Sequence, residues 1–370
     1  MHVYKVVFMD LTFSAIPIQS GSQLSNVRYL ASFSYGDIHS LITENRLYVP
    51  NHPELPDFAQ RKPNASRLKQ IASYVLENYL TGTIYFPPVC INVYPHPEYS
   101  NGRITIPYSS VSMRLTDGQH RCFGIHQALQ ELEQSDFQEK EKLSQHQLGV
   151  FLYTALPIEE ERQAFRDQNL LVQRPSISLA YLFDRRSPHV FIAKQLMQKV
   201  EQFQDNVETV ENGLGTNNPK LLTLSTLVTA TKFMFPYLKK IDEIDQEGEW
   251  AITFWSQVAE ILEDNPWQTM PIAERCCQRK KTIVISAIFF QALGILGHDF
   301  WTENISALEL ANYLGQLNTL NWDKNNTFWL EKGVTQVGAK DTPIISNTRT
   351  TVNLCYQTLK EYIGLVSRIL

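Results

Sequence analysis

Apolar and polar residues alternate over short stretches in the first half of the chain, which predicts strands separated by short helices. The predicted strands are Val3–Leu11, Arg28–Phe33, Thr83–Tyr94 with a break at Pro87–Pro88, Arg103–Ile106, Ser112–Leu115 and Leu148–Ala155. Apolar residues at helical spacing follow Asn64, a candidate N-cap, and recur at Cys122–Leu132 and Glu159–Asn169. This half is therefore expected to be an α+β unit.

From about residue 191 onward, strand patterns become rare and long amphipathic or apolar segments dominate. The predicted helices are Leu221–Phe235, Trp250–Leu262, Ala273–Leu296, Ala307–Leu317 and Thr348–Leu370. A chain of 370 residues is long enough for two hydrophobic cores. We therefore expect an α+β domain over residues 1–190 and a mostly α-helical domain over residues 191–370.

Composition narrows the class of protein. A hydrophobic content of 43% is that of an ordinary globular chain, and the net charge of -5 argues against a simple electrostatic nucleic-acid binder. Five cysteines without a C-x-x-C pair favour a reducing compartment. Met1–Asp10 lacks the pattern of a signal peptide, and the longest apolar stretch, Ile283–Leu296, is too short to span a bilayer. A cytoplasmic location without membrane partners is expected.

One short motif suggests chemistry. A predicted strand leads into Asp117-Gly118-Gln119-His120-Arg121, and an amphipathic helix follows. A helix N-terminus presents free N–H groups and favours negative charge, and glycine lets the backbone approach a phosphate closely. Arg121 adds a charged fork for phosphate oxygens, and His120 could donate a hydrogen bond or transfer a proton. The motif therefore predicts a phosphate site.

The same residues also fit an ordinary capped helix, with Asp117 as the N-cap and Arg121 as a solvated side chain. Asp117 could equally hold a cation, and Gln119 offers both a donor and an acceptor. None of the five positions holds a residue whose natural place is a hydrophobic core. That density of functional side chains favours the phosphate site over the simple cap.

The motif also resembles the signature of the DGQHR-domain proteins, relatives of the ParB nucleotide-binding domain and of sulfiredoxin. Further blocks extend the resemblance over about residues 45–190, namely Arg61, Asn64 and Arg67 before the helix Leu68–Asn78, then Phe165–Asn169, Arg174–Leu179 and Leu182–Arg186. In this order the blocks are similar to those of the DndB family. The resemblance implies a ParB/sulfiredoxin-like N-terminal domain attached to a helical domain.

The resemblance implies a function as well. DndB-type proteins are accessory and regulatory proteins of bacterial DNA phosphorothioation, a defence system, and they control its gene cluster through DNA binding. The implied ligand is ATP or another nucleotide, with Mg²⁺ as a candidate companion ion. The implied partners are DNA, other DNA-modification proteins and a second copy of the chain in a homo-oligomer. The implied site residues are Asp117 and His120 for catalysis, and Gly118, Gln119, Arg121, Asn169, Arg174 and Arg67 for nucleotide binding.

Two other functions stay open. Some relatives, including a subunit of the deazaguanine DNA-insertion pathway, are linked to ATP hydrolysis, so the chain could be a DNA-stimulated ATPase. It could also be a scaffold with a degenerate pocket. Sulfinic-acid reduction is not expected, because the reactive cysteine of the sulfiredoxin relatives is replaced here by Gln119. Cys122 is predicted to be a buried structural residue on the apolar face of its helix.

Several weaker sequence features have two interpretations. The basic run Arg275–Lys281 could meet DNA phosphates, but a solvated helix start is favoured. Ser346–Thr351 could bind a phosphate or simply cap the last helix. Glu159–Glu161 is read as an acidic helix start rather than a metal site. The tryptophans all fall in the predicted helical domain, where core packing is the default and base stacking the alternative.

Overall fold

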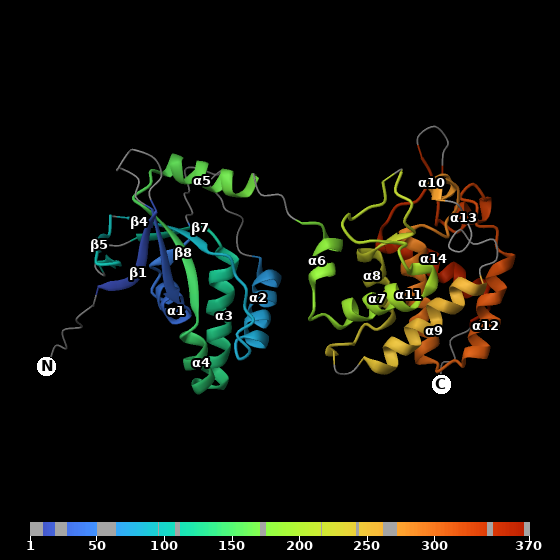
Figure 1. Cartoon of the computed structure of the whole chain (residues 1–370), viewed down its shortest axis with the longest axis horizontal. Coiled ribbons are helices and arrows are strands. Elements are labelled where there is room, and N and C mark those ends of the chain that lie inside the picture. Colours follow the sequence, from blue (N-terminus) through green and yellow to red (C-terminus); the bar gives the residue numbers. More distant parts are fainter. Residues whose placement is uncertain are drawn as a thin grey trace. The chain divides into compact units, whose positions relative to one another are not determined.

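The computed structural model describes residues 10–18, 28–49, 64–94, 96–107, 112–170, 175–215, 217–241, 244–261, 272–338 and 343–365. The chain divides into two compact units, unit 1 over Met1–Gln173 and unit 2 over Arg174–Leu370. Residues 174–190, which the sequence analysis placed in the first domain, thus fall in unit 2. The architecture is α+β, with a mixed sheet in unit 1 and mostly helices in unit 2 (Figure 1).

Unit 1 is built on an eight-stranded sheet with the order β3-β7-β4-β8-β2-β1-β6-β5. The pairs β3–β7 and β4–β8 are parallel and the other pairs are antiparallel. Its strands are β1 (Leu11–Ile18), β2 (Arg28–Ser34), β3 (Leu47–Tyr48), β4 (Val89–Tyr94), β5 (Glu98–Ser100), β6 (Arg103–Ile106), β7 (Ser112–Asp117) and β8 (Gln147–Thr154). Its helices are α1 (Tyr35–Thr43), α2 (Ala65–Asn78), α3 (Gln119–Ser135), α4 (Phe137–Ser144) and α5 (Ile158–Leu170).

The two faces of this sheet are covered differently. Side chains alternate along a strand, so Val89, Ile91 and Val93 of β4 enter the main core of unit 1 together with α1–α4. Cys90 and Asn92 point the other way, toward α5, which lies across the sheet from α1–α4 (Figure 1). The residues Val89–Val93 of β4 are thereby buried on both faces of the sheet.

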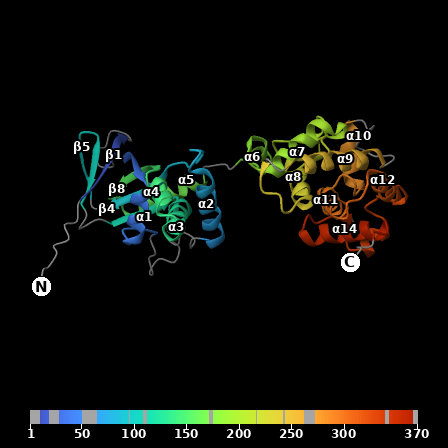
Figure 2. The same cartoon turned by 90° about the horizontal axis from the view of Figure 1, so that it is seen from below.

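Unit 2 surrounds a long apolar helix. Its helices are α6 (Ile177–Phe183), α7 (Pro188–Lys199), α8 (Leu224–Met234), α9 (Asp245–Ile261), α10 (Ile272–Lys281), α11 (Ala287–Thr302), α12 (Ala307–Gly315), α13 (Thr327–Glu331) and α14 (Arg349–Tyr362), with 3-10 turns at Glu201–Phe203 and Gln316–Thr319. Short strand pairs are β9 (Val207–Glu208) with β10 (Leu222–Thr223) and β11 (Gln336–Val337) with β12 (Pro343–Ile344). Figure 2 shows α11 among α8, α9 and α14.

Close packing of α11 on α8 requires glycine. A Cβ atom at Gly294 would lie 2.3 Å from the carbonyl oxygen of Ala230, so no side chain fits there. Phe254, Trp255 and Phe290 belong to the same core and are completely buried. The tryptophans of this unit that are fully buried, Trp255 and Trp329, are core residues as the default interpretation predicted.

Most predicted elements are confirmed, and three of the differences are informative. Asn64 caps α2 through Arg67 N–H, and Asn101-Gly102 forms the β5–β6 turn with both residues at positive φ. The single segment predicted over Ala273–Leu296 is instead two helices, α10 and α11. The break contains the β-branched run Ile283-Val284-Ile285, and the N–H of Ile283 donates to the carbonyl of Trp322.

The other two differences are in unit 1. Helix α1, which begins with a capping box formed by Ser34 and Asp37, was not predicted. The predicted strand Val3–Leu11 lies mostly outside the described residues, and β1 instead begins at Leu11.

Candidate functional site

The predicted phosphate motif forms a sharp turn between β7 and α3. Asp117 is the last residue of β7, Gly118 is the N-cap with φ 91° and ψ 15°, and Gln119 opens the helix. A Cβ at Gly118 would lie 2.4 Å from Cγ1 of Val89. Both the backbone angle and the contact with β4 therefore require glycine.

The interpretation of Asp117 as the N-cap is wrong. The N-cap is Gly118, which has no side chain, and the first turn of α3 contains no acidic residue. The carboxylate of Asp117 instead accepts a hydrogen bond from Nη2 of Arg121 at 2.7 Å. No side chain caps the start of α3, so its first N–H groups keep the electrostatic character that favours an anion.

Arg121 holds the turn from inside. Its guanidinium binds Asp117, and its Nη1 donates to the carbonyl oxygens of Pro87 and Pro88, the latter at 3.0 Å. The side chain is only 16% exposed. These contacts tie α3 to the segment that leads into β4, so the structure supports a role for Arg121 in shaping the turn. Its predicted direct contact with phosphate stays a prediction.

His120 links the start of α3 to the start of α2. Its Nε2 accepts a hydrogen bond from the backbone N–H of Asn64 at 3.3 Å, and Asn64 is itself the N-cap of α2. Burial lowers the pKa of His120 below its usual value, the positive charge of Arg67 lowers it further, and Asp117 opposes the change. A neutral ring that accepts at Nε2 carries its proton on Nδ1. His120 and Arg67 are thus electrostatic neighbours at this junction.

The junction exists because α2 and α3 pack closely. A Cβ at Gly124 of α3 would lie 2.4 Å from Cγ2 of Ile71 of α2, which brings the two helix backbones together. Neither helix has an acidic residue in its first turn, and Arg67 is exposed in the first turn of α2. Two positive dipole ends, one arginine and one histidine therefore surround the same small region. We call this region, defined by Asn64, Arg67, Gly118 and His120, the paired helix start.

A polar cluster lies behind the turn, on the α5 side of the sheet. Cys90 of β4 pairs with Asp117 of β7 in register, and Gln168 of α5 donates through Nε2 to the hydroxyl of Tyr153 at 2.6 Å. Burial raises the pKa of the Cys90 thiol to about 11, and the negative charge of Asp117 adds to the rise. Cys90 is therefore a protonated, unreactive thiol at neutral pH.

The first turn of α5 is anchored to the sheet by a buried carboxylate. Glu161 is 2% exposed, and its Oε2 accepts hydrogen bonds from Asn92 and Arg114, each at 2.9 Å. Asn92 also binds both the N–H and the carbonyl of Leu156. The sequence suggested only an acidic helix start here. Asn92, the one amide in the otherwise apolar β4, and Arg114, between Met113 and Leu115 of β7, were the available signal.

The structure describes only some of the remaining predicted site residues. Gln119 is half-buried at the start of α3. Asn169 belongs to the last turn of α5, but its side chain is outside the described residues, and Arg174 is outside them altogether. The structure thus brings together Arg67, His120 and the turn, whereas the contributions of Asn169 and Arg174 stay predictions.

Comparison with known proteins now decides the family. A sequence model of the DndB family, described as DNA-sulfur modification-associated, matches residues 16–366. The chain belongs to the DndB family. Membership implies a role associated with DNA sulfur modification. No curated protein and no solved structure matches the chain.

Other features of this DndB family member make structural contacts in the described residues. Cys122 is completely buried, and burial raises the pKa of its thiol to about 12, as expected for a structural cysteine. Thr348 caps α14 through its hydroxyl, so N-capping explains that hydroxyl-rich segment. Arg275 binds Asn206 within unit 2. No group of three His, Cys, Asp or Glu side chains in the described part of the chain could hold a metal ion, and no described helix is long and apolar enough to cross a membrane.

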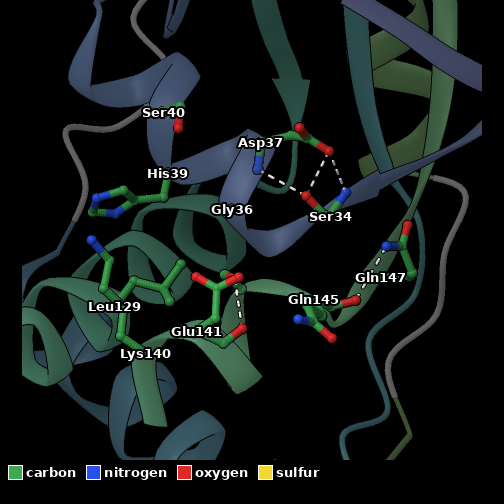
Figure 3. A pocket seen from close by; sticks show the side chains of 11 residues that line it. Ser34, Gly36, Asp37, His39, Ser40, Leu129, Lys140, Glu141, Gln145 and Gln147 are labelled. Atoms are coloured by element: carbon green, nitrogen blue, oxygen red, sulfur yellow. Dashed lines mark hydrogen bonds between the residues drawn. The ribbon is translucent and has the colours of Figure 1, made fainter. Parts of the chain in front are cut away.

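Unit 1 also has a shallow pocket of about 460 Å³ between α1 and α4 (Figure 3). Ser34 and Asp37 on its wall are bound to each other in the capping box of α1. Lys140 and Glu141 give the lining charges of both signs. Its polar groups thus serve helix capping and surface solvation, and the paired helix start remains the stronger candidate site.

Proposed function

We propose that this chain is an accessory and regulatory protein of DNA phosphorothioation that binds the phosphates of a nucleotide at the paired helix start. One observation carries the proposal, namely the convergence of the N-termini of α2 and α3 next to Arg67 and His120. Convergent N–H groups and one arginine at a glycine turn suit a phosphate group. ATP is the nucleotide to test first.

The fold of unit 1 is part of the same proposal. We assign it to a variant of the ParB/sulfiredoxin-like fold, and the strand–turn–helix unit with the DGQHR residues supports the assignment. Gln119 stands where the sulfiredoxin relatives have their reactive cysteine, and the nearby thiols of Cys90 and Cys122 both have raised pKa values. The unit is therefore proposed to bind a ligand rather than to carry out thiol chemistry.

A companion Mg²⁺ would depend on the nucleotide for most of its ligands. Asp117 is the carboxylate of the turn, and Arg121 already holds it. Mg²⁺ characteristically binds through substrate phosphates, water and one or two carboxylates. Asp117 would supply at most one such ligand to an ion that the phosphates bring with them.

A DNA-stimulated ATPase is the second candidate, and His120 is the observation that favours it. Its pKa is lowered, so its ring is neutral near pH 7 and can accept a proton from an attacking water molecule. Its Nε2 is already bonded to Asn64 N–H, so this role requires that bond to open. In a His120→Gln variant the amide can still donate to a phosphate, so this candidate predicts loss of turnover with retained ATP binding.

Calorimetry with matched variants tests the binding proposal. Arg67→Ala should weaken ATP binding by about 1.5–3 kcal/mol, because it removes a charge-assisted hydrogen bond. Lys69→Ala removes the same charge from an exposed position of the same helix and should leave the affinity unchanged. Equal effects of the two substitutions would show that only general charge matters, and the site would then be abandoned.

Measurements with duplex DNA separate the regulatory and enzymatic roles. Full-length protein is mixed with labelled ATP, with and without DNA, and phosphate release is followed. ATP and DNA binding without turnover supports the regulator, whereas DNA-stimulated release supports the ATPase. Absence of both nucleotide binding and turnover contradicts the proposal and leaves the scaffold.

A further inference from the structure

Unit 2 contains a pocket that is separate from the DGQHR residues of unit 1. Its volume is about 480 Å³, within the range of small-ligand sites. It lies between the start of α11, Arg279 of α10 and the segment around β12. Leu221, Ile288 and Ile345 form part of an apolar wall.

The charged groups that line this pocket in the described part of the chain all have the same sign. Arg279 and Lys324 line it, and no Asp or Glu is among its described lining residues. Arg279 donates to backbone carbonyls, including that of Asn218 at 2.8 Å, while its Nε is buried and has no hydrogen-bond acceptor in the described residues. Lys324 donates to the carbonyl of Arg279 at 2.5 Å. Among the described lining residues, two cations are therefore held close together without a counter-charge.

Electrostatics makes this arrangement unfavourable while the pocket contains no anion. Burial lowers the pKa of Lys324, and the neighbouring charge of Arg279 lowers it further. Burial also lowers the pKa of Arg279. An anion placed between the two groups would relieve both effects, because it stabilises the charged form of each.

The start of α11 adds donors to the same pocket. Ser286 is its N-cap, but the Ser286 hydroxyl donates to the carbonyl of Ile283 at 2.6 Å and makes no capping bond. Ser286, Ala287 and Ile288 line the pocket, and the first turn of α11 has no acidic residue. The positive end of this 16-residue helix therefore faces the cavity together with the two cations.

We propose that this pocket is a second ligand site, in which Lys324, Arg279 and the first turn of α11 hold a phosphomonoester whose apolar or aromatic body rests on the wall formed by Leu221, Ile288 and Ile345. Cations on one side and an apolar wall on the other match a ligand with one anionic end. A free mononucleotide and the 5′-phosphorylated end of a DNA strand both offer this chemistry. The site is independent of the paired helix start.

Tryptophan fluorescence of the full chain measures binding here selectively. All tryptophans lie at Trp250 or beyond, and the carbonyl of Trp322 accepts the N–H of Ile283 beside the pocket. The probes are AMP, adenosine and inorganic phosphate. AMP should bind at least about tenfold more tightly than adenosine, because adenosine lacks the phosphate. Equal binding of AMP and adenosine, or no binding of AMP, overturns the proposal.

Two substitutions test the geometry without relying on lost folding. Lys324→Met keeps the aliphatic stem, and Ala287→Asp adds a carboxylate to a helix start that has none, which should stabilise the helix while repelling an anion. Each should weaken AMP binding at least about tenfold. Lys280→Met and Ala307→Asp make the same changes at exposed positions of α10 and α12 and should leave AMP binding unchanged.

Further arms identify the source of the ligand and separate the two sites. Tighter binding of AMP than of a 5′-phosphorylated oligonucleotide assigns a free nucleotide, and the reverse order assigns a DNA end. Arg67→Ala should leave the tryptophan signal unchanged, since it affects only the paired helix start. Unchanged AMP affinity in both Lys324→Met and Ala287→Asp refutes the second site, whatever the result at the first.

Discussion

Replacing Gly118 with alanine should destabilise unit 1 more than the same substitution at a glycine with open space around it. The residue has φ 91°, and an added Cβ would lie 2.4 Å from Cγ1 and 2.8 Å from Cβ of Val89. The backbone conformation costs roughly 1–2 kcal/mol for a residue with a side chain. Overpacking adds roughly 1–3 kcal/mol. We therefore expect Gly118→Ala to lower the free energy of unfolding of unit 1 by about 2–5 kcal/mol.

The same unit provides a matched control. Gly82 also has a positive φ, 65°, but a Cβ there would meet nothing within 4 Å. Gly82→Ala should therefore show only the conformational cost of about 1–2 kcal/mol. Val89→Ala removes the atom that makes the closer contact with the added Cβ. The loss of unfolding free energy in the double variant Gly118→Ala/Val89→Ala should therefore be smaller, by about 1 kcal/mol, than the sum of the losses in the two single variants.

Urea denaturation can follow the two units separately. Because unit 1 contains no tryptophan, tryptophan fluorescence reports on unit 2, whereas far-UV circular dichroism reports on both. In Gly118→Ala the transition seen only by circular dichroism should move to lower urea, and the fluorescence transition should stay in place. If Gly118→Ala and Gly82→Ala unfold at the same urea concentration, the packing of the turn against Val89 is not as described.

The other predictions concern α5 and the histidines of unit 1. Ala155 has φ 52°, so Ala155→Gly should leave unit 1 at least as stable in urea, and a loss above about 1 kcal/mol contradicts this. Glu161→Gln should destabilise unit 1 by about 1.5–3 kcal/mol, because Arg114 loses its carboxylate, and an unchanged midpoint contradicts this. Burial lowers the pKa values of His39 and His126 below 6.5. The positive charge of Lys140 lowers the pKa of His39 further, and His39 lowers that of His126 further. Because the unfolded chain binds these protons more tightly, stability is fully present above pH 6.5 and falls as the pH drops through the lower folded pKa values. His126→Gln should reduce this loss of urea stability in acid, and an unaltered pH profile counts against it.

Local sequence patterns predicted many of the elements but not the contacts between them. Asn64 followed by apolar residues at helical spacing predicted α2, and the DGQHR block predicted the turn before α3. Nothing in the local pattern placed Asn64 beside His120, because their hydrogen bond depends on the packing of α2 against α3. Gly124 in the middle of a helix was the available signal of that close approach.

Charge patterns were the least reliable guide. The sequence pattern predicted that Glu161 is part of an acidic helix start, but Glu161 is buried against Arg114. Its partner comes from a strand that is distant in sequence, so the local pattern did not show the contact. Arg121 was predicted to be a phosphate ligand, and within the turn it binds Asp117 and two carbonyls, so its contact with phosphate stays a prediction. A sequence shows which side chains can form ion pairs, whereas the fold decides whether a side chain or a ligand becomes the partner.

Titration of the His120 ring by NMR, with and without ATP, tests the central claim most directly. A phosphate at the paired helix start should raise the lowered pKa of His120, because negative charge stabilises the protonated ring. His189 of unit 2, whose pKa burial also lowers, provides the reference that should not change. A rise for His120 alone is the predicted result. ATP binding that leaves the His120 titration unchanged would place the nucleotide elsewhere and contradict the account.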